Sequence, residues 1–298
     1  NAVEYVQSAI NAGLDVDSFA PRLSFFFVAQ SDLFEEVSKF RAARRMWANI
    51  MRNHFKAKNP RSWMCRFHTQ TAGVTLTAQQ PDNNVVRSTL QGLSAILGGT
   101  QSLHVNSRDE ALSLPTPESA ELSLRTQQIL AHETRITDTV DPLGGSYYIE
   151  NLTDQIELKA NSYIDQIKDM GGALGAIQQG FQIKEIHDSA YKLQQDVENN
   201  HETVVGVNAF QTTDPTIIPI QRIDPDQTKN QLKRLAKVKS ERNPDEVEKR
   251  LHALRMAASS TQNIMPFMID AVENYVTVGE ISDALRSVFG EQKEFSPF

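Results

Sequence analysis

The stretch that decides the fold contains two short segments, Trp63-Met-Cys-Arg-Phe-His-Thr-Gln-Thr71 and Thr100-Gln-Ser-Leu-His-Val-Asn106, joined by a connection long enough for a helix. Successive side chains of a β-strand point to opposite faces. If both segments are strands, their polar side chains share one face: Arg66, His68 and Gln70 in the first, and Ser102, His104 and Asn106 in the second. Two neighbouring strands would then present a line of hydrogen-bonding groups.

Such a polar face indicates a bound ligand. The interior of an ordinary barrel is filled by Val, Ile and Leu, and buried polar groups without partners are costly. A polar molecule lying on this face would supply the partners. The alternative, in which His68 and His104 are core histidines with partners inside the protein, stays open at this point.

Composition narrows the class of protein. The 298 residues are 40% hydrophobic and 22% charged, which is typical of a globular protein, and the net charge of −7 gives no support for a nucleic-acid partner. No apolar run approaches the ~18–20 residues that span a bilayer, so no membrane partner is expected. The single cysteine, Cys65, excludes an internal disulfide, favours a cytoplasmic location, and is more typical of a buried structural thiol than of a nucleophile.

The order of the first elements predicts a parallel α/β fold. A helix at 1–13 precedes a strand at Phe19–Val28, and a helix capped by Asp32 leads to the first of the two polar segments. Helical crossovers of this length connect parallel strands. A (β/α) barrel has eight such units, and only three are visible. The rest of the barrel is therefore expected outside this chain, unless a partner completes an open sheet; the start in mid-helix without Met also suggests a piece of a larger protein.

Beyond residue 110 the sequence is mostly helical. We expect helices at 109–114, 118–133 and across most of 153–290, with Pro115 and Pro117 as a break. Two short β segments interrupt this region in the prediction: Tyr147–Glu150 and Val204–Asn208.

The common catalytic motifs are absent. His68, His104 and Glu110 have suitable side chains for a metal, but their spacing matches no standard ligand pattern, so no metal site is predicted. The sequence contains no G-x-S-x-G, no G-x-x-x-x-G-K-[ST] and no G-x-G-x-x-G. The cluster Arg41, Arg44 and Arg45 could bind a phosphate, although a solvated or ion-paired helix face is the more common role of such a cluster.

Five ordered motifs resemble the large subunit of the methylmalonyl-CoA mutase family of acyl-CoA mutases. They are Phe19-Ala-Pro-Arg-Leu-Ser-Phe-Phe, Arg66-Phe-His-Thr-Gln-Thr-Ala-Gly, Gly98-Gly-Thr-Gln-Ser-Leu-His-Val-Asn-Ser-Arg-Asp-Glu-Ala, Asp141-Pro-Leu-Gly-Gly-Ser-Tyr-Tyr and Thr277-Val-Gly-Glu-Ile-Ser-Asp-Ala-Leu-Arg. The resemblance implies an acyl-CoA threaded through a (β/α)8 TIM barrel, with adenosylcobalamin capping the carboxyl ends of the strands. It assigns residues 1–110 to the last strands of that barrel. Residues 111–298 would be a helical region that wraps the barrel and links toward a separate cobalamin-binding subunit.

The resemblance also implies roles for individual residues. Arg22, Leu23 and Ser24 would contact CoA, and His68 and Gln70 would be the catalytic residues, near the substrate and the corrin.

Three further residues would bind the cofactor, adenosylcobalamin: Gln101, Asn106 and Glu110. Glu110 would accept hydrogen bonds from the ribose hydroxyls. The cofactor provides the radical chemistry, while the protein positions the reacting groups and keeps water away.

Two family features are missing from the sequence. The Tyr-His pair that contacts the thioester, and the Arg and Tyr that select the acyl group, lie upstream of residue 1 in the family. The D-x-H-x-x-G motif of the cobalamin-binding domain does not occur around any histidine. The cobalamin domain is therefore expected on a separate small subunit, in an oligomeric enzyme.

The resemblance favours an isomerase that interconverts (R)-methylmalonyl-CoA and succinyl-CoA. Isobutyryl-CoA and 2-hydroxyisobutyryl-CoA are the alternative substrates. A catalytically silent, structural subunit of a heterodimeric mutase is a second alternative.

Overall fold

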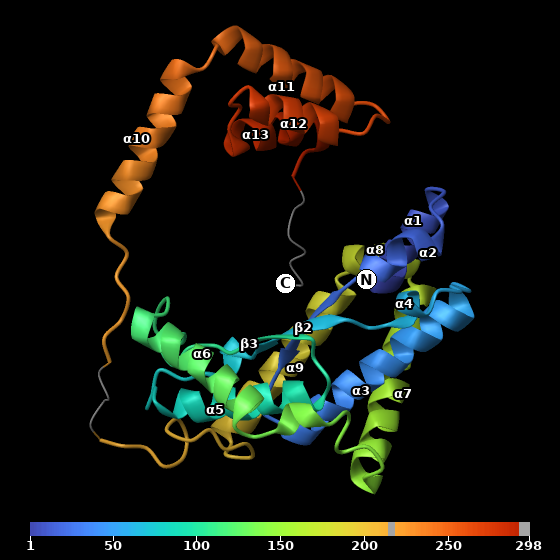
Figure 1. Cartoon of the computed structure of the whole chain (residues 1–298), viewed down its shortest axis with the longest axis vertical. Helices are drawn as coiled ribbons and strands as arrows, with labels where there is room; N and C mark the ends of the chain where they lie inside the picture. Colours follow the sequence, from blue (N-terminus) through green and yellow to red (C-terminus); the bar gives the residue numbers. More distant parts are fainter. Residues whose placement is uncertain (214–217, 292–298) are drawn as a thin grey trace. The chain divides into compact units, whose positions relative to one another are not determined.

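The computed structural model describes residues 1–213 and 218–291 of the chain. The chain forms two compact units, Asn1–Gln221 and Arg222–Phe298, and each has its own hydrophobic cluster (Figure 1). The expected division near residue 110 concerns the barrel and linker of the complete protein and stays a prediction. No helix in the described part of the chain is long and apolar enough to cross a membrane.

The first unit contains a three-stranded parallel sheet of order β1-β2-β3. The strands are β1 (Phe25–Ala29), β2 (Phe67–Thr71) and β3 (Ser102–His104), and the crossovers contain α3 (Leu33–Asn49) and α5 (Asn83–Leu97). The predicted order of alternating helices and parallel strands is confirmed. The protein is therefore of mixed α/β type, with a small parallel sheet and many helices.

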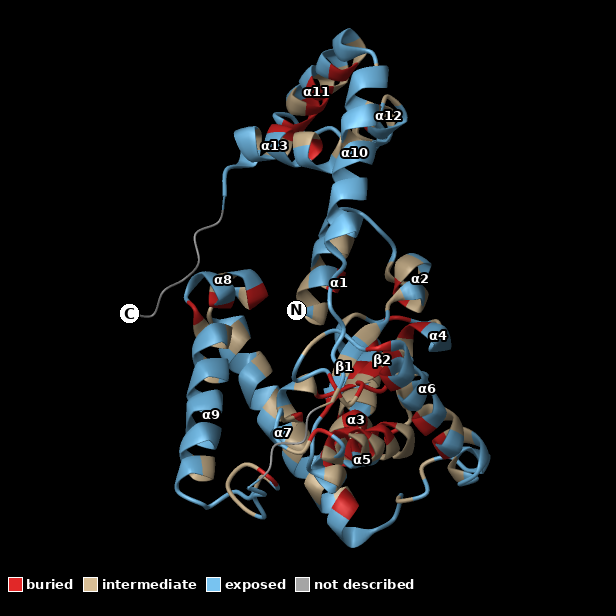
Figure 2. Cartoon of the chain, turned by 90° about the vertical axis from the view of Figure 1, so that its left-hand side faces the viewer, coloured by how far each residue is buried: buried red, intermediate tan, exposed pale blue. Residues whose placement is uncertain are grey.

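One face of the sheet is packed by aromatic side chains. The Phe67 ring lies 5.2 Å from those of both Phe27 and Phe40, and Phe40 comes from α3. A Cβ atom at Gly98 would lie 2.4 Å from the Phe40 ring, so a glycine is required where the end of α5 meets α3. Figure 2 shows the buried residues concentrated around β2, α3 and α5.

The strands begin later than the sequence predicts. The segment expected as a strand from Phe19 forms α2 (Val16–Phe19) and a 3-10 turn (Ala20–Arg22), and β1 starts only at Phe25. Pro21 has no N–H to donate, and its fixed φ suits the first turn of a helix. Similarly, Pro60 opens the short helix α4 (Pro60–Trp63), so Trp63 lies outside β2.

Three further local predictions are wrong. Residues 109–114 form turns rather than a helix: the Asp109 carbonyl accepts from the backbone N–H groups of Leu112 (2.8 Å) and Ser113 (2.9 Å), but the helical pattern is not continued. Tyr147–Glu150, expected as a β segment, is the first turn of a long helix, α7 (Tyr147–Asp169). Val204–Asn208 contains only one end of an isolated bridge, between Val205 and Ala209.

The remaining helices of this unit surround the α/β part. They are α1 (Ala2–Asn11), α6 (Pro117–His132), α7, α8 (Gly172–Gln178) and α9 (Phe181–Glu198), and a π-helical turn (Ile50–His54) continues α3. Figure 2 shows α9 as largely exposed. The predicted helical character of residues 118–133 and 153–198 is confirmed.

Ion pairs join α3 to the segment that contains α7. Arg41 binds Asp141 (3.0 Å) and Glu150 (2.7 Å), and its side chain is only 12% exposed. Arg45 binds Asp154 and Glu157. The ion-paired interpretation of the arginine cluster is therefore confirmed for these two arginines.

The second unit is helical. It contains α10 (Pro225–Glu241), α11 (Pro244–Ala258), α12 (Met265–Glu273) and α13 (Val278–Phe289). Leu254, Ala271 and Ile281 are buried between the last three helices. Thr277 and Glu280 form a capping box at the start of α13, and Glu280 also binds Arg242 at 2.6 Å.

The Arg242–Glu280 pair makes the stability of this bundle depend on pH. Hydrogen bonds from Arg242, with further ones from Thr277, lower the pKa of Glu280 from 4.5 to about 2. A depressed carboxyl pKa adds stability above the unfolded-state pKa, and this stability is lost as the pH falls toward the folded-state value. Between pH 4.5 and pH 2, amide exchange in α13 should therefore accelerate beyond its intrinsic pH dependence.

Glu280→Gln should remove that pH dependence and should speed exchange in α13 already at pH 6. Glu248→Gln is the matched control, because the Glu248 side chain is 69% exposed and its ion pair within the described residues is with Arg255. Exchange measured peptide by peptide at each pH compares the variants directly. Equal protection of α13 in Glu280→Gln and the unmodified protein at pH 6 would contradict the assignment.

Candidate functional site

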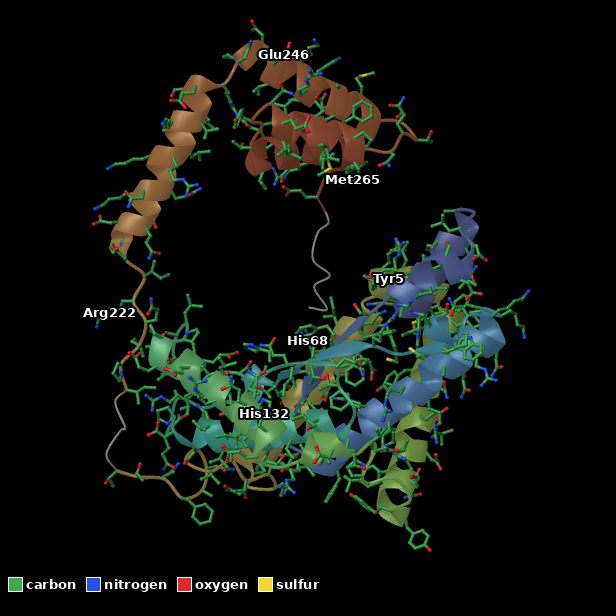
Figure 3. The ribbon with its side chains drawn as sticks, in the orientation of Figure 1. Tyr5, His68, His132, Arg222, Glu246 and Met265 are labelled. Atoms are coloured by element: carbon green, nitrogen blue, oxygen red, sulfur yellow. The ribbon has the colours of Figure 1, made fainter. Side chains whose placement is uncertain are left out.

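The second face of the sheet is open within the described residues. Phe26 is 64% exposed, and it lies in register with His68, which in turn lies in register with Ser102. The rings of Phe26 and His68 lie 5.1 Å apart, and Nδ1 of His68 is 2.7 Å from the Ser102 hydroxyl. Figure 3 labels His68 on β2. The predicted sharing of one face by His68 and Ser102 is confirmed.

The next row across the same face is Val28, Gln70 and His104. Gln70 Nε2 donates to Asn106 Oδ1 at 2.9 Å, and Asn106 Nδ2 donates to the Thr71 carbonyl at 2.8 Å. The backbone N–H of Asn106 donates to the Thr71 hydroxyl at 2.8 Å. These bonds fix both amide side chains at the carboxyl edge of β2 and β3. Asn106 is only 2% exposed.

Glu110 joins this group across Gly73. A Cβ atom at Gly73 would lie 2.7 Å from Glu110 Oε1 and 3.2 Å from Asn106 Nδ2, so the absence of a side chain at residue 73 leaves a small cradle that these two groups occupy. Burial of the Glu110 carboxylate raises its pKa, and the nearby Asp109 charge raises it further. Gln70, Asn106 and Glu110 therefore converge after the carboxyl ends of neighbouring parallel strands, where α/β folds commonly bind ligands.

Arg22, Leu23 and Ser24 lie at the opposite, amino edge of the sheet, just before β1. Arg22 and Ser24 are exposed, whereas Leu23 packs against the core. Arg66 donates to the carbonyl oxygens of Pro21 and Leu23 and so holds the turn that presents them. The open face thus has a cationic group, Arg22, at its amino end and a carboxylate, Glu110, at its carboxyl end.

Gln101 is not brought together with Asn106 and Glu110. It lies before β3, and its Oε1 accepts from the Phe67 N–H at 2.7 Å while its Nε2 donates to the Gly99 carbonyl at 2.7 Å. Both ends of the side chain are used to join β2 to the turn before β3. A cofactor-binding role for Gln101 stays a prediction.

Comparison with known proteins identifies the family of the chain. The sequence model of the methylmalonyl-CoA mutase family matches residues 1–291. The chain belongs to the methylmalonyl-CoA mutase family. This confirms the resemblance drawn from the five motifs.

The relatives are mutases, and hence isomerases. The chain is 43% identical over 300 residues to the 2-hydroxyisobutanoyl-CoA mutase large subunit of Aquincola tertiaricarbonis, covering 100% of this chain and 53% of that protein. It is 41% identical over 295 residues to the mitochondrial methylmalonyl-CoA mutase of Homo sapiens, covering 98% of this chain and 39% of that protein. The methylmalonyl-CoA mutase of Rhizobium meliloti is 42% identical over 290 residues, with 97% and 41% covered. The chain therefore spans about half or less of these mutases.

One polar residue that the sequence analysis missed supports the candidate site. Gln91 of α5 is 1% exposed, accepts from the Ala72 N–H at 3.1 Å and donates to the Thr75 hydroxyl at 2.7 Å. It thereby fixes the turn that contains Gly73. A signal was present in the sequence, because the buried stripe of α5 carries small and polar side chains at helical spacing: Asn84, Ser88, Gln91 and Ala95.

A metal centre finds no support in the geometry. Across residues 1–213 and 218–291, no group of three or more His, Cys, Asp and Glu side chains could hold a metal ion. His104 is exposed on the open face, whereas the Glu110 carboxylate lies in the cradle at Gly73.

Cys65 is not a candidate nucleophile. The residue is 6% exposed, and burial raises the pKa of its thiol to about 12, although the positive charge of Arg44 opposes the shift. At pH 8 about one thiol in ten thousand would be ionised, and the thiolate is the reactive species. The predicted structural role of Cys65 is consistent with its burial.

We therefore expect Ellman's reagent to leave Cys65 unmodified at pH 8 until the protein is denatured in guanidinium. Ser24→Cys provides a positive control, because residue 24 is exposed. That variant should release one equivalent of the reagent's thiolate in the native state. Rapid reaction of the unmodified protein would contradict the burial of Cys65.

Proposed function

We propose that this chain is the barrel-closing and linker part of the large subunit of an adenosylcobalamin-dependent acyl-CoA mutase. The observation that carries the proposal is the open face of the parallel sheet, with exposed Arg22 at one end and the Gln70–Asn106–Glu110 group at the other. Family membership supports the reaction class, and the geometry supports the position of the site.

A complete (β/α)8 barrel would explain the exposure of this face. Parallel sheets are normally covered on both faces, and a closed barrel leaves no strand edge unpaired. Within the described residues, β1 and β3 each pair on one side only. We assign residues 1–110 to the barrel, with the open face of the sheet toward the barrel axis. We assign residues 111–298 to a helical region that surrounds the barrel; residues 214–217 and 292–298 of that region lie outside the described part.

The acyl-CoA would lie along the open face. Arg22 can donate to a phosphate or a carbonyl of CoA, and the Ser24 hydroxyl can form a hydrogen bond with the CoA molecule. Leu23 packs into the core and so holds the turn that presents them. The row of Phe26 and His68 is the next part of the face. The thioester would then lie near His68 and Gln70.

His68 can bind the acyl group directly. Its Nδ1 is engaged by Ser102, and its Nε2 has no hydrogen-bond partner among the described residues. A neutral imidazole that accepts from Ser102 at Nδ1 would present an N–H at Nε2. That N–H could donate to the thioester carbonyl and hold it in place during rearrangement, while Phe26 limits the access of water.

The carboxyl edge fits adenosylcobalamin. Asn106 and Gln70 present amide groups, and the Glu110 carboxylate, which lies against Gly73, can accept from hydroxyls such as those of a ribose. A contact of Gln101 with the cofactor is proposed from the resemblance alone, because its amide is bonded to the Phe67 N–H and the Gly99 carbonyl before β3. When bound, adenosylcobalamin supplies the organic radical that starts the rearrangement of the carbon skeleton. The protein residues bind and orient the two ligands.

The proposed reaction is the interconversion of (R)-methylmalonyl-CoA and succinyl-CoA. The relative named as a 2-hydroxyisobutanoyl-CoA mutase large subunit supports a second candidate, a 2-hydroxyisobutyryl- or isobutyryl-CoA mutase. That relative is a large subunit by name, which supports a second, smaller subunit in an oligomer, and we propose that the small subunit binds cobalamin. A cytoplasmic location stays a prediction, since several relatives are named mitochondrial.

The experiment uses the complete large subunit with its small subunit and tests each of the three acyl-CoA substrates. We expect turnover of (R)-methylmalonyl-CoA, and we expect His68→Ala to lower kcat by about 100-fold or more, as the loss of a positioned hydrogen-bond donor commonly does. His132→Ala is the control, because His132 is exposed at the end of α6 (Figure 3).

An unchanged rate for His68→Ala would remove His68 from the site. Turnover of only one of the other two substrates would select the second candidate. Absence of cobalamin binding at this barrel, measured with the small subunit present, would indicate the silent subunit.

A further inference from the structure

The loop that follows β3 contains two of the residues placed at the cofactor, and it is folded around a buried carboxylate. Asp109 is 0% exposed. Its Oδ1 accepts from the Ser107 hydroxyl at 2.6 Å, and its Oδ2 accepts from the Thr116 N–H at 3.0 Å. Thr116 is the N-cap of α6, so Asp109 ties the loop to the start of that helix.

A second set of hydrogen bonds, made by Asn84, fixes the other end of the loop. Asn84 is 0% exposed and donates through Nδ2 to the carbonyl oxygens of Arg108 (3.0 Å) and Thr77 (2.9 Å). Its Oδ1 accepts from the Thr77 N–H at 3.1 Å. Asn84 thereby joins the loops that follow β2 and β3. Residue 109 lies between two fixed points, the Arg108 carbonyl and the Thr116 N–H.

Glu110 is the residue whose position this arrangement determines. It directly follows Asp109, and its Oε1 lies where a Cβ atom of Gly73 would be 2.7 Å away. Burial alone would raise the pKa of Asp109, but the hydrogen bonds from Ser107, Thr116 and Ser119 together lower it below its ordinary value. Asp109 is therefore ionised at neutral pH, and its lone pairs are directed at these donors rather than at a ligand.

We propose that Asp109 is a positioning residue for cofactor binding: its buried carboxylate holds the loop after β3 so that the Glu110 carboxylate lies against Gly73 at the carboxyl edge of the sheet. This inference rests on the proposed function. Asp109 itself does not contact the ligand, because it is fully buried. Its effect on binding is exerted through Glu110.

Asp109→Asn tests this role with little change of volume. An amide cannot accept at both positions, so one of the Ser107 and Thr116 donors would face an NH₂ group. Adenosylcobalamin is titrated, by absorbance, into the complete large subunit together with its small subunit. We expect the Kd to rise by about 10- to 100-fold, by analogy with residues that orient metal ligands. Amide exchange in residues 107–116 should accelerate in the same variant.

A double-mutant cycle with Glu110→Gln separates positioning from a general loss of structure. If Asp109 acts through Glu110, the double variant should bind adenosylcobalamin no more weakly than Glu110→Gln alone. If the two substitutions acted independently, their fold-changes in Kd would multiply in the double variant instead. Glu118→Gln is the matched control, because Glu118 is exposed in the first turn of α6, and it should bind as the unmodified protein does.

Failure of the inference and failure of the proposed function give different results. If the unmodified protein does not bind adenosylcobalamin, the proposed function fails. If it binds and Asp109→Asn binds equally well, or if the effects of Asp109→Asn and Glu110→Gln multiply, the positioning role is overturned. Should Asp109→Asn fail to fold, Ser107→Ala removes one of the two bonds, and it should show a smaller loss of affinity that again disappears in the Glu110→Gln background. An undiminished loss in that background would also overturn the role.

Discussion

A parallel sheet needs cover on both faces, and the described residues cover only one face of this sheet. Phe27, Phe40 and Phe67 pack the covered face, while Phe26 and His68 lie on the other. A face that alternates aromatic and hydrogen-bonding groups is a poor match for a purely apolar protein layer, since its polar groups would lose water without gaining partners. The proposed acyl-CoA, which has polar groups along its length, satisfies this constraint.

Most buried polar side chains at the carboxyl edge serve the backbone rather than a ligand. Gln91 fixes the turn at Gly73, and Asn84 joins the loops after β2 and β3. Asp109 closes the second of these loops. Because these groups are satisfied internally, they can be buried at low cost and keep the loops rigid. Few groups remain to meet the proposed cofactor, and their positions are set without it.

The sequence predicted the part of the fold that depends on local periodicity. Alternation in β2 and β3 correctly placed His68 and Ser102 on one face, because the strand period leaves no choice. The alternation pattern could not predict that the Gln101 side chain accepts a hydrogen bond from the Phe67 N–H, since that contact joins residues distant in sequence. Tyr147 and Tyr148 have high β propensity, yet tertiary packing of α7 on α3 overrides it. The proposed closure of a barrel and the choice of substrate are not determined by the contacts of these residues.

A structure of the complete protein with a bound acyl-CoA tests the central claim most directly. The account predicts that the pantetheine chain runs along the face between β1 and β2, with Arg22 and Ser24 near its nucleotide end and His68 within hydrogen-bond distance of the thioester. A complete protein in which side chains from its own core cover Phe26 and His68, and in which acyl-CoA binds elsewhere, would contradict it.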